Sequence, residues 1–164
     1  MKGLHQHITI GTSAFGKGVF ATRNLKAGSV ICHVTGPRIT FADTLQLGKE
    51  ESYAVQIDHD SYLLCQPPFV YTNHSCFPNC GVNRRLQMLA MYDIEAGEEL
   101  FWDYSTSMLE RHWTMSCACG HAQCRKHITD FDLLEEHLQL YYLERNLVLP
   151  FIVQHLRQQW KRTA

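Results

Sequence analysis

The stretch that decides the fold reads Tyr71-Thr72-Asn73-His74-Ser75-Cys76-Phe77-Pro78-Asn79-Cys80 and follows an apolar pair, Phe69-Val70. It contains two Asn, one His and two Cys, which are side chains that form hydrogen bonds or bind metals, and it has little that favours a helix or a strand. This density predicts a loop that is held in place by what it binds. The alternative is an ordinary surface turn at Pro78-Asn79, because both residue types are common in turns.

Length and composition limit the class of protein. The chain has 164 residues, which suits one domain with its own hydrophobic core. Hydrophobic residues make up 45% and charged residues 19%, and no apolar run is long enough to cross a bilayer, so a soluble globular protein is expected. The first residues lack the apolar centre of a signal peptide, which predicts a cytoplasmic or nuclear location.

Cysteine content and net charge argue against two further classes. Seven Cys in a chain without an export signal favour thiols or metal ligands over disulfides, because reducing compartments disfavour disulfides. The net charge is -1 with the ten His counted as neutral, so the chain lacks the basic surface that nucleic-acid binding normally needs. We therefore expect no direct nucleic-acid binding and no association with a membrane.

From residue 7 to about residue 104 the chain has the pattern of short β-strands. β-Rich runs at residues 8–10, 19–21 and 30–34 are separated by glycines. Residues 53–57, and the even positions of residues 86–92, alternate with the period of two that is typical of half-buried strands. Residues 21–28 and 90–97 also resemble each other, since each would end a strand and turn at an Ala-Gly pair. That match is too short to define a repeat.

After Ser105 the pattern becomes helical. Thr129 or Asp130 could cap a first helix, whose apolar stripe would consist of Leu134, Leu138 and Tyr141 or Tyr142. Pro150 suits the first turn of a second helix, whose apolar stripe would consist of Val153, Leu156 and Trp160. The two helices are predicted to form a hairpin at the end of the chain. Whether they also pair two copies into a homodimer is open.

Three thiols, from Cys117, Cys119 and Cys124, lie within eight residues. Cys117 and Cys119 are separated by one residue, which makes a disulfide between them strained, but Gly120 permits a tight turn around one tetrahedral ion. The natural ion is zinc, which takes four ligands in structural sites. The fourth ligand could be His121, His127 or a distant residue, with Cys76 and Cys80 as candidates. The alternative is a loop with merely reduced cysteines.

Three pieces of the sequence together resemble the SET-domain protein lysine methyltransferases. They are residues 16–21 (GKGVFA), residues 73–80 (NHSCFPNC) and residues 97–104 (GEELFWDY). The Cys-x-Cys-Gly-x-x-x-Cys piece is similar to the post-SET zinc loop, so the resemblance covers residues 7 to 126. It implies a mainly β fold of small curled sheets with a pseudoknot. The chain would divide into a SET domain (1–106), a post-SET-like zinc segment (107–127) and a helical extension (128–164).

The resemblance also implies roles for individual residues toward S-adenosylmethionine, the methyl donor of the family. Lys17 and Gly18 would offer backbone groups to it, and Asn73 and His74 would hold its methionine and adenine parts. Tyr104 matches the catalytic tyrosine, which would also contact the donor.

By the same likeness, Tyr53 falls where a second tyrosine often lines the active site. Cys76 would complete a zinc site with Cys117, Cys119 and Cys124. Without the resemblance, Tyr53 would more naturally be a core residue on one face of a strand.

The chain departs from the family pattern at three positions. Val70 stands where the family often has Arg, and Phe101 stands where it often has Thr. Trp102 occupies the position where Phe or Tyr commonly tunes how many methyl groups are added. An indole there should crowd the pocket for the amine, so a bias toward low methylation states is predicted. Trp102 could alternatively be plain core packing, and Asp103 beside it could be a turn residue.

The chemistry of methyl transfer agrees with these residue types. A lysine amine has a pKa of about 10.4, so it must lose a proton before it can attack. An apolar channel with walls from Tyr53, Trp102 and Tyr104 would disfavour the ammonium form. The expected substrate is a protein that presents a lysine, histone or non-histone. Two alternatives are a catalytically silent, zinc-stabilised interaction module and an enzyme that methylates a small amine.

Overall fold

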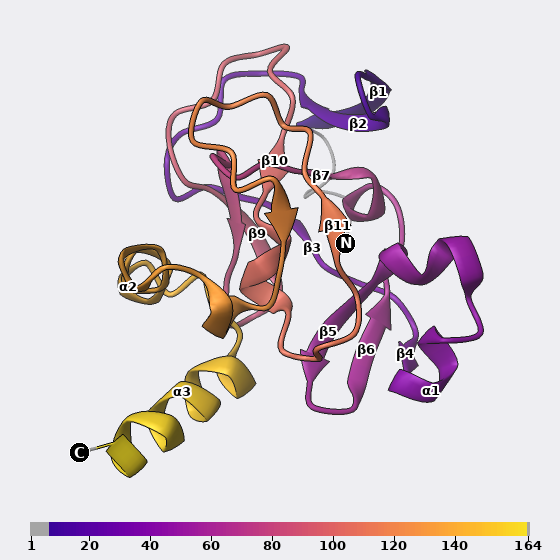
Figure 1. Cartoon of the computed structure of the whole chain (residues 1–164). Coiled ribbons are helices and arrows are strands. Elements are labelled where there is room, and N and C mark those ends of the chain that lie inside the picture. The colour runs from indigo at the N-terminus through magenta and orange to yellow at the C-terminus, as the bar shows by residue number, and fades with distance from the viewer. Residues whose placement is uncertain (1–6, 164) are drawn as a thin grey trace.

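The computed structural model describes residues 7–163, which form five small β-sheets joined by short helices and long connections (Figure 1). Residues 1–6, which belong to the predicted first segment and to the stretch tested for a signal peptide, and residue 164 lie outside the described residues. The strands are β1 (Ile8–Ser13), β2 (Gly16–Ala21), β3 (Val30–His33), β4 (Arg38–Ile39), β5 (Ala54–Asp58), β6 (Ser61–Leu64), β7 (Asn73–His74), β8 (Cys80–Val82), β9 (Gln87–Ala90), β10 (Phe101–Trp102), β11 (Met115–Ser116) and β12 (His127–Ile128). The α-helices are α1 (Phe41–Thr44), α2 (Glu136–Glu144) and α3 (Pro150–Thr163), and the 3₁₀ helices are η1 (Gly48–Tyr53), η2 (Phe69–Tyr71), η3 (Tyr104–Ser107) and η4 (Phe131–Leu133).

Four of the five sheets are antiparallel, with the strand orders β1-β2, β3-β9-β8, β4-β6-β5 and β11-β12. Sheets of two or three strands cannot bury a core alone, so they must pack on each other. This arrangement is the mainly β fold of small sheets that the sequence predicts. Tight turns suffice for such hairpins, which agrees with the glycines between the predicted strands.

The fifth sheet is the parallel pair of β7 and β10, in which Asn73 lies opposite Phe101 and His74 lies opposite Trp102. Parallel strands need a long crossover, and residues 75–100 form it here. The pairing places the 71–80 stretch beside the start of η3, where Tyr104 lies. The prediction of a loop for the whole stretch is therefore wrong, because Tyr71 ends η2, residues 73–74 form β7 and Cys80 begins β8.

The two segments that resemble each other in sequence, residues 21–28 and 90–97, pair with each other. Leu25 and Ile94 exchange two backbone hydrogen bonds of 2.8 and 2.9 Å. Further along, the N–H of Gly28 donates to Ala90, and the N–H of Gly97 donates to the carbonyl of residue 21, so the contacts repeat with approximate twofold symmetry. Both glycines have a positive φ, which favours residues without a Cβ. The pairing fixes the end of β2 against the connection that leads to β10.

The hydrophobic core lies between the three-stranded sheets and the C-terminal helices. Ile31, Met88 and Ile152 are at most 2% exposed, and burial of side chains of this size contributes about 1.5–3 kcal/mol each. Gly81 in β8 allows close contact with the C-terminal segment, because a Cβ there would lie 2.7 Å from the side chain of Leu147. The helices thus cover one side of the sheets (Figure 1).

The predicted strands are present with shifted bounds. Met88 and Ala90 on the even positions of β9 are buried, as the alternation predicted. The strand predicted at residues 53–57 begins one residue later than expected, because Tyr53 ends η1 and β5 begins at residue 54. Val55 and Gln56 are both buried. Gln56 can be buried because its side chain accepts a 2.8 Å hydrogen bond from the backbone N–H of Leu109. A polar side chain with an internal partner breaks the alternation.

Both predicted C-terminal helices are present, but the first begins later than expected. Asp130 does not cap it, because the Asp130 carboxylate accepts hydrogen bonds from the backbone N–H groups of Glu110 and Arg111. Residues 131–133 form η4 instead, and α2 begins at Glu136. On the predicted stripe, Leu134 and Tyr142 are buried.

The second helix, α3, begins at Pro150, as predicted. It buries Phe151, Ile152 and Leu156 inside this chain, so much of its apolar stripe already has an internal role. Trp160, the last residue of the predicted stripe, is 52% exposed.

Candidate active site

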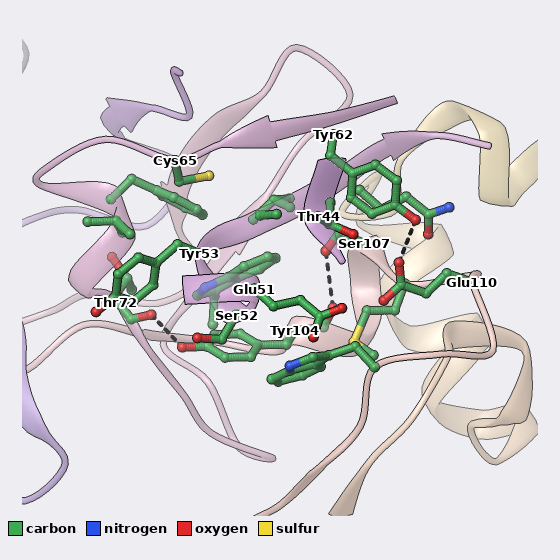
Figure 2. Close-up of a pocket in the computed structure, with 18 residues that line it drawn as sticks. Thr44, Glu51, Ser52, Tyr53, Tyr62, Cys65, Thr72, Tyr104, Ser107 and Glu110 are labelled. Carbon is green, nitrogen blue, oxygen red and sulfur yellow. Dashed lines mark hydrogen bonds between the residues drawn. The ribbon is translucent and has the colours of Figure 1, made fainter. Parts of the chain in front are cut away.

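Two hollows share Tyr104 in their walls. The larger, of about 650 Å³, is lined partly by Phe15, Lys17, Tyr71, Asn73, His74, Met115, Cys117 and Cys119. The smaller, which we call the aromatic cavity, has about 50 Å³ and is lined partly by Tyr62, Cys65, Phe69, Thr72, Trp102, Ser107 and Glu110 (Figure 2). The residues that line both are Ser52, Tyr53, Val70, Tyr104 and Trp113. A ligand in the larger hollow can therefore meet a group inserted into the aromatic cavity at Tyr104.

Segments far apart in the sequence build the larger hollow. Lys17 comes from β2, Asn73 and His74 come from β7, Tyr104 begins η3, and residues 115–119 come from the cysteine-rich loop. The structure thus brings together the early Gly-x-Gly turn, the Asn-His pair and the tyrosine that the sequence singled out. The size of the hollow suits a ligand as large as a nucleotide.

Asn73 holds the β2 turn at the edge of the larger hollow. Its side-chain amide donates hydrogen bonds of 2.9 Å to the carbonyl oxygen of Lys17 and to the carboxylate of Glu99. Gly18 is buried and is not among the residues that line the hollow. Its lack of a side chain is explained by Glu99, because a Cβ on Gly18 would lie 2.4 Å from the Glu99 carboxylate. The Lys17 ammonium lies over the ring of Tyr71, 4.6 Å from its centroid.

The His74 ring is buried and makes contacts within the chain. The backbone N–H of Tyr104 donates to its Nδ1 at 3.2 Å, so the ring proton must be on Nε2, which faces the sulfur of Cys76 at 3.4 Å. Burial lowers the pKa of His74 to about 4; the Asp103 carboxylate opposes this shift and Arg125 adds to it. A neutral imidazole at neutral pH therefore connects the cysteine cluster to the backbone of Tyr104.

The Tyr104 hydroxyl points at the wall of the aromatic cavity. It donates a 2.9 Å hydrogen bond to the carbonyl oxygen of Thr72, and Figure 2 shows this bond beside the ring of Tyr53. Burial raises the pKa of Tyr104 well above its usual value, with a smaller contribution from Cys65. The phenol therefore stays protonated at neutral pH, which suits a group that orients a substrate and not one that removes its proton.

Aromatic side chains form the floor of the aromatic cavity. Trp102 is 3% exposed and packs between Phe69, at 5.3 Å between ring centroids, and Tyr104, at 5.1 Å. Trp102 is therefore both core packing and cavity wall. Tyr53, which is 39% exposed, lies at the end of η1, where its ring can border both hollows, so the expectation of a buried strand residue is wrong.

Several cavity residues carry no signal in the sequence. The Tyr62 hydroxyl donates to Glu110 over 2.5 Å, and burial, above other causes, raises the pKa of the Glu110 carboxyl group. Thr72 and Trp113 also line the cavity. Tyr62, Glu110 and Trp113 belong to no spacing motif, and Tyr62 and Glu110 meet only through tertiary folding.

Asp103 is the centre of a buried polar network. Asp103 is 1% exposed. Its carboxylate accepts two hydrogen bonds of 2.7 Å from the Arg125 guanidinium and one of 2.9 Å from the Tyr142 hydroxyl. It also accepts a 3.1 Å bond from the N–H of Ser105 and so caps η3. The sequence leaves open a role for Asp103 as a turn residue. Asp103 does cap η3, but most of the hydrogen bonds of its carboxylate hold Arg125 and Tyr142. The network joins the cysteine loop and α2 to the residue that precedes Tyr104.

We predict that Asp103→Asn lowers the free energy of unfolding by about 3–5 kcal/mol, because it leaves the Arg125 charge poorly paired in a buried site. Tyr142→Phe, which removes one hydrogen bond to the same carboxylate, should cost about 1.5–3 kcal/mol. Urea denaturation of the two variants beside the native chain checks both values. A loss below about 1 kcal/mol for Asp103→Asn, within the range of an ordinary surface substitution, would contradict a buried charge pair.

Four thiols gather next to this network. The sulfurs of Cys76, Cys117, Cys119 and Cys124 all lie within 4.8 Å of one another. Sulfurs that each lie about 2.3 Å from one tetrahedral zinc ion are about 3.8 Å apart, so the group fits a structural zinc site. The antiparallel pair β11-β12 holds the two ends of the loop together.

The other candidates for the fourth ligand lie outside this group. Cys80 is fully buried in β8. The His121 ring stacks on Phe77 at 4.3 Å between centroids, and His127 is exposed in β12.

Comparisons with known proteins agree with this geometry. The SET domain family matches residues 16–105. The variant-silencing SET domain-containing protein of Plasmodium falciparum is 30% identical over 134 residues, which are 69% of this chain and 5% of that protein. A histone-lysine N-methyltransferase of Emericella nidulans, H3 lysine-4 specific, is 30% identical over 129 residues, which are 66% of this chain and 10% of that protein.

A solved structure has a similar fold. The crystal structure of KRYPTONITE in complex with mCHG DNA and S-adenosylhomocysteine (SAH) superposes with a TM-score of 0.58 at 25% sequence identity. The match covers 74% of this chain and 29% of the KRYPTONITE chain. This chain therefore spans only a small part of the length of these relatives. Among residues 7–163, none of the helices has the length and apolar character that crossing a membrane requires.

Proposed function

Because the chain belongs to the SET-domain family, we propose that it is a methyltransferase that transfers the methyl group of S-adenosylmethionine to the ε-amine of a lysine in a protein. The observation that carries this proposal is the meeting of two hollows at Tyr104. Methyl transfer is an in-line displacement, so the methyl donor and the attacking amine must approach one carbon from opposite sides. Two hollows that meet at Tyr104 and share part of their walls satisfy this requirement.

In this proposal the larger hollow holds S-adenosylmethionine. Lys17, Asn73 and His74 would contact it, with Tyr104 at the junction and Gly18 behind the lining. The Asn73 amide and the His74 ring already have partners within the chain, so these two residues would bind through their backbone groups. Because Gly18 is not in the lining, its contribution is to let β2 approach Glu99 closely.

The aromatic cavity would take the lysine side chain. Its apolar walls, from Tyr53, Trp102 and Tyr104, disfavour an ammonium ion, so the amine can lose its proton to water before it attacks. In the transfer a nitrogen–carbon bond forms to the methyl group and the sulfur–carbon bond breaks, with its electron pair going to sulfur. The Tyr104 and Tyr53 hydroxyls would orient the amine, since a protonated phenol is a poor base.

The four-cysteine group would hold a structural zinc ion, which closes the loop over the larger hollow. The three segments proposed from the sequence, residues 1–106, 107–127 and 128–164, correspond to a SET domain, this zinc loop and the helices that pack on the core. The names of the relatives favour a histone as substrate and a nuclear location. Two expectations from the sequence stay predictions. The molecular mass in solution checks homodimerisation through the C-terminal helices, and a DNA titration checks the lack of nucleic-acid binding.

Trp102 is predicted to restrict the number of methyl groups added. It is buried between Phe69 and Tyr104, so its indole cannot move aside for a bulkier amine. Trp102→Phe should therefore raise the fraction of dimethyl and trimethyl lysine among the products. Mass spectrometry of the product at equal turnover measures this. Trimethyllysine as the main product of the native chain would contradict the prediction.

Radiolabelled methyl transfer tests the proposed function. Native chain with zinc is incubated with labelled S-adenosylmethionine and, separately, with core histones, a cell extract or free lysine. Label on lysine in protein supports the proposal, and label on free lysine alone supports an enzyme for small amines. Neither label nor saturable binding of S-adenosylmethionine would identify a silent interaction module.

A further inference from the structure

Thr72 is one of the residues that line the aromatic cavity, and its hydroxyl is a buried polar atom. Thr72 lines the cavity with Phe69, Val70 and Trp102, and it is only 2% exposed. Its Oγ1 is buried and has no hydrogen-bond partner among residues 7–163. Native structures rarely keep a buried hydroxyl without a partner unless a ligand or a water supplies one.

The backbone around Thr72 is fixed on both sides. Its N–H donates a 2.8 Å hydrogen bond to the carbonyl of Phe69, and its carbonyl accepts the 2.9 Å bond from the Tyr104 hydroxyl. The next residue, Asn73, is held by Lys17 and Glu99. The residue whose hydroxyl has no partner is thus locked directly to the tyrosine at which the two hollows meet.

We propose that the Thr72 hydroxyl accepts a hydrogen bond from the ε-amine of the substrate lysine and thereby selects amines that still carry a proton. This inference rests on the proposed lysine methyltransferase activity. A neutral lysine amine has two N–H groups, a monomethyl amine has one and a dimethyl amine has none. When the nitrogen lone pair points at the methyl donor, an N–H is left to meet the hydroxyl in the first two cases only.

The expected consequence is a preference for the first and second transfers over the third. In each transfer the nitrogen–carbon bond forms, the sulfur–carbon bond breaks, and the proton of the resulting ammonium passes to water. A dimethyl amine has no N–H to donate to the Thr72 hydroxyl. The transition state of the third transfer therefore lacks one hydrogen bond that the first two transfers have. A site built to bond an N–H rejects the analogue that lacks it.

This role differs from that of Trp102, which acts by size. Thr72→Val keeps the shape of the side chain and removes only the hydroxyl, whereas Thr72→Ser keeps the hydroxyl and removes a methyl group. Thr72→Ala removes both groups. Together the three variants separate hydrogen bonding from packing.

The test compares two substrates for each variant. A mixture of core histones and cell-extract proteins is used untreated or after reductive dimethylation of its lysines, and transfer from isotopically labelled S-adenosylmethionine is counted on each. The ratio of the two rates within one protein preparation does not depend on the fraction of chain that is folded. The ratio of untreated to dimethylated substrate should fall about tenfold in Thr72→Val and Thr72→Ala, the effect of one ordinary hydrogen bond. In Thr72→Ser it should stay close to the native ratio.

An unchanged ratio in Thr72→Val would overturn the inference while leaving the methyltransferase activity in place. A ratio in Thr72→Ser that falls as far as in Thr72→Val would also overturn it, because packing would then be the cause. A native chain that transfers no methyl to either substrate would refute the proposed function, and the inference with it.

Discussion

Tyr104→Phe is expected to reduce methyl transfer by about 10²–10³-fold, the loss that follows removal of one preorganised donor at a reacting centre. The Tyr104 hydroxyl donates to the carbonyl of Thr72 at the junction of the two hollows, so it is held in place before any substrate arrives. Binding of SAH should change little, because the ring and its contacts with Trp102 and His74 remain. Initial rates and a calorimetric titration with SAH measure the two effects.

Tyr92→Phe is the matched control for this change. Tyr92 is 44% exposed, and its hydroxyl bonds to Tyr141 on the surface, outside both hollows. The control should keep its activity. If Tyr104→Phe kept it too, the tyrosine would have no part in the chemistry.

Loss of one of the proposed zinc ligands is expected to have the second large effect. Cys119→Ser should release the metal and open the loop of residues 115–128, since binding energies of structural zinc reach about 10–16 kcal/mol in small domains. This loop supplies Met115, Cys117 and Cys119 to the wall of the larger hollow. Affinity for SAH should therefore fall on the order of 100-fold or more, because ordering the loop would then oppose binding. Atomic emission of the purified chain gives the zinc content, and the SAH titration gives the affinity.

Cys80→Ala is the control for the proposed zinc ligands, because Cys80 lies outside the group of Cys76, Cys117, Cys119 and Cys124. Cys80 is fully buried in the core, so its removal should cost some stability but leave one zinc per chain. Loss of zinc from Cys80→Ala, or retention of zinc in Cys76→Ser, would contradict the proposed ligand set.

The parts of the site that the sequence could predict are those that lie in short motifs. Asn73 and His74 stand in one dense stretch, the thiols of the loop stand within eight residues, and Tyr104 ends a recognisable segment. Tyr53 lines both hollows, but it ends η1 and does not lie in the strand predicted for it. Residue types at fixed spacing carry this information because local geometry decides which side chains can share a ligand.

The residues that could not be predicted depend on tertiary contacts. Asp103 meets Arg125 and Tyr142 across 22 and 39 positions of the chain, and no local pattern indicates such a meeting. Thr72 lies inside the stretch that decides the fold, yet only burial and the lack of a partner distinguish its hydroxyl from that of a turn residue. The start of α2 was misplaced for the same reason, because the Asp130 side chain bonds to distant backbone groups.

A crystal structure of the zinc-loaded chain with SAH tests the central claim most directly. We expect the sulfur of SAH at the junction of the two hollows, facing the Tyr104 hydroxyl, with the nucleoside against Lys17, Asn73 and the cysteine loop. SAH bound elsewhere, or with its sulfur turned away from the aromatic cavity, would contradict the account.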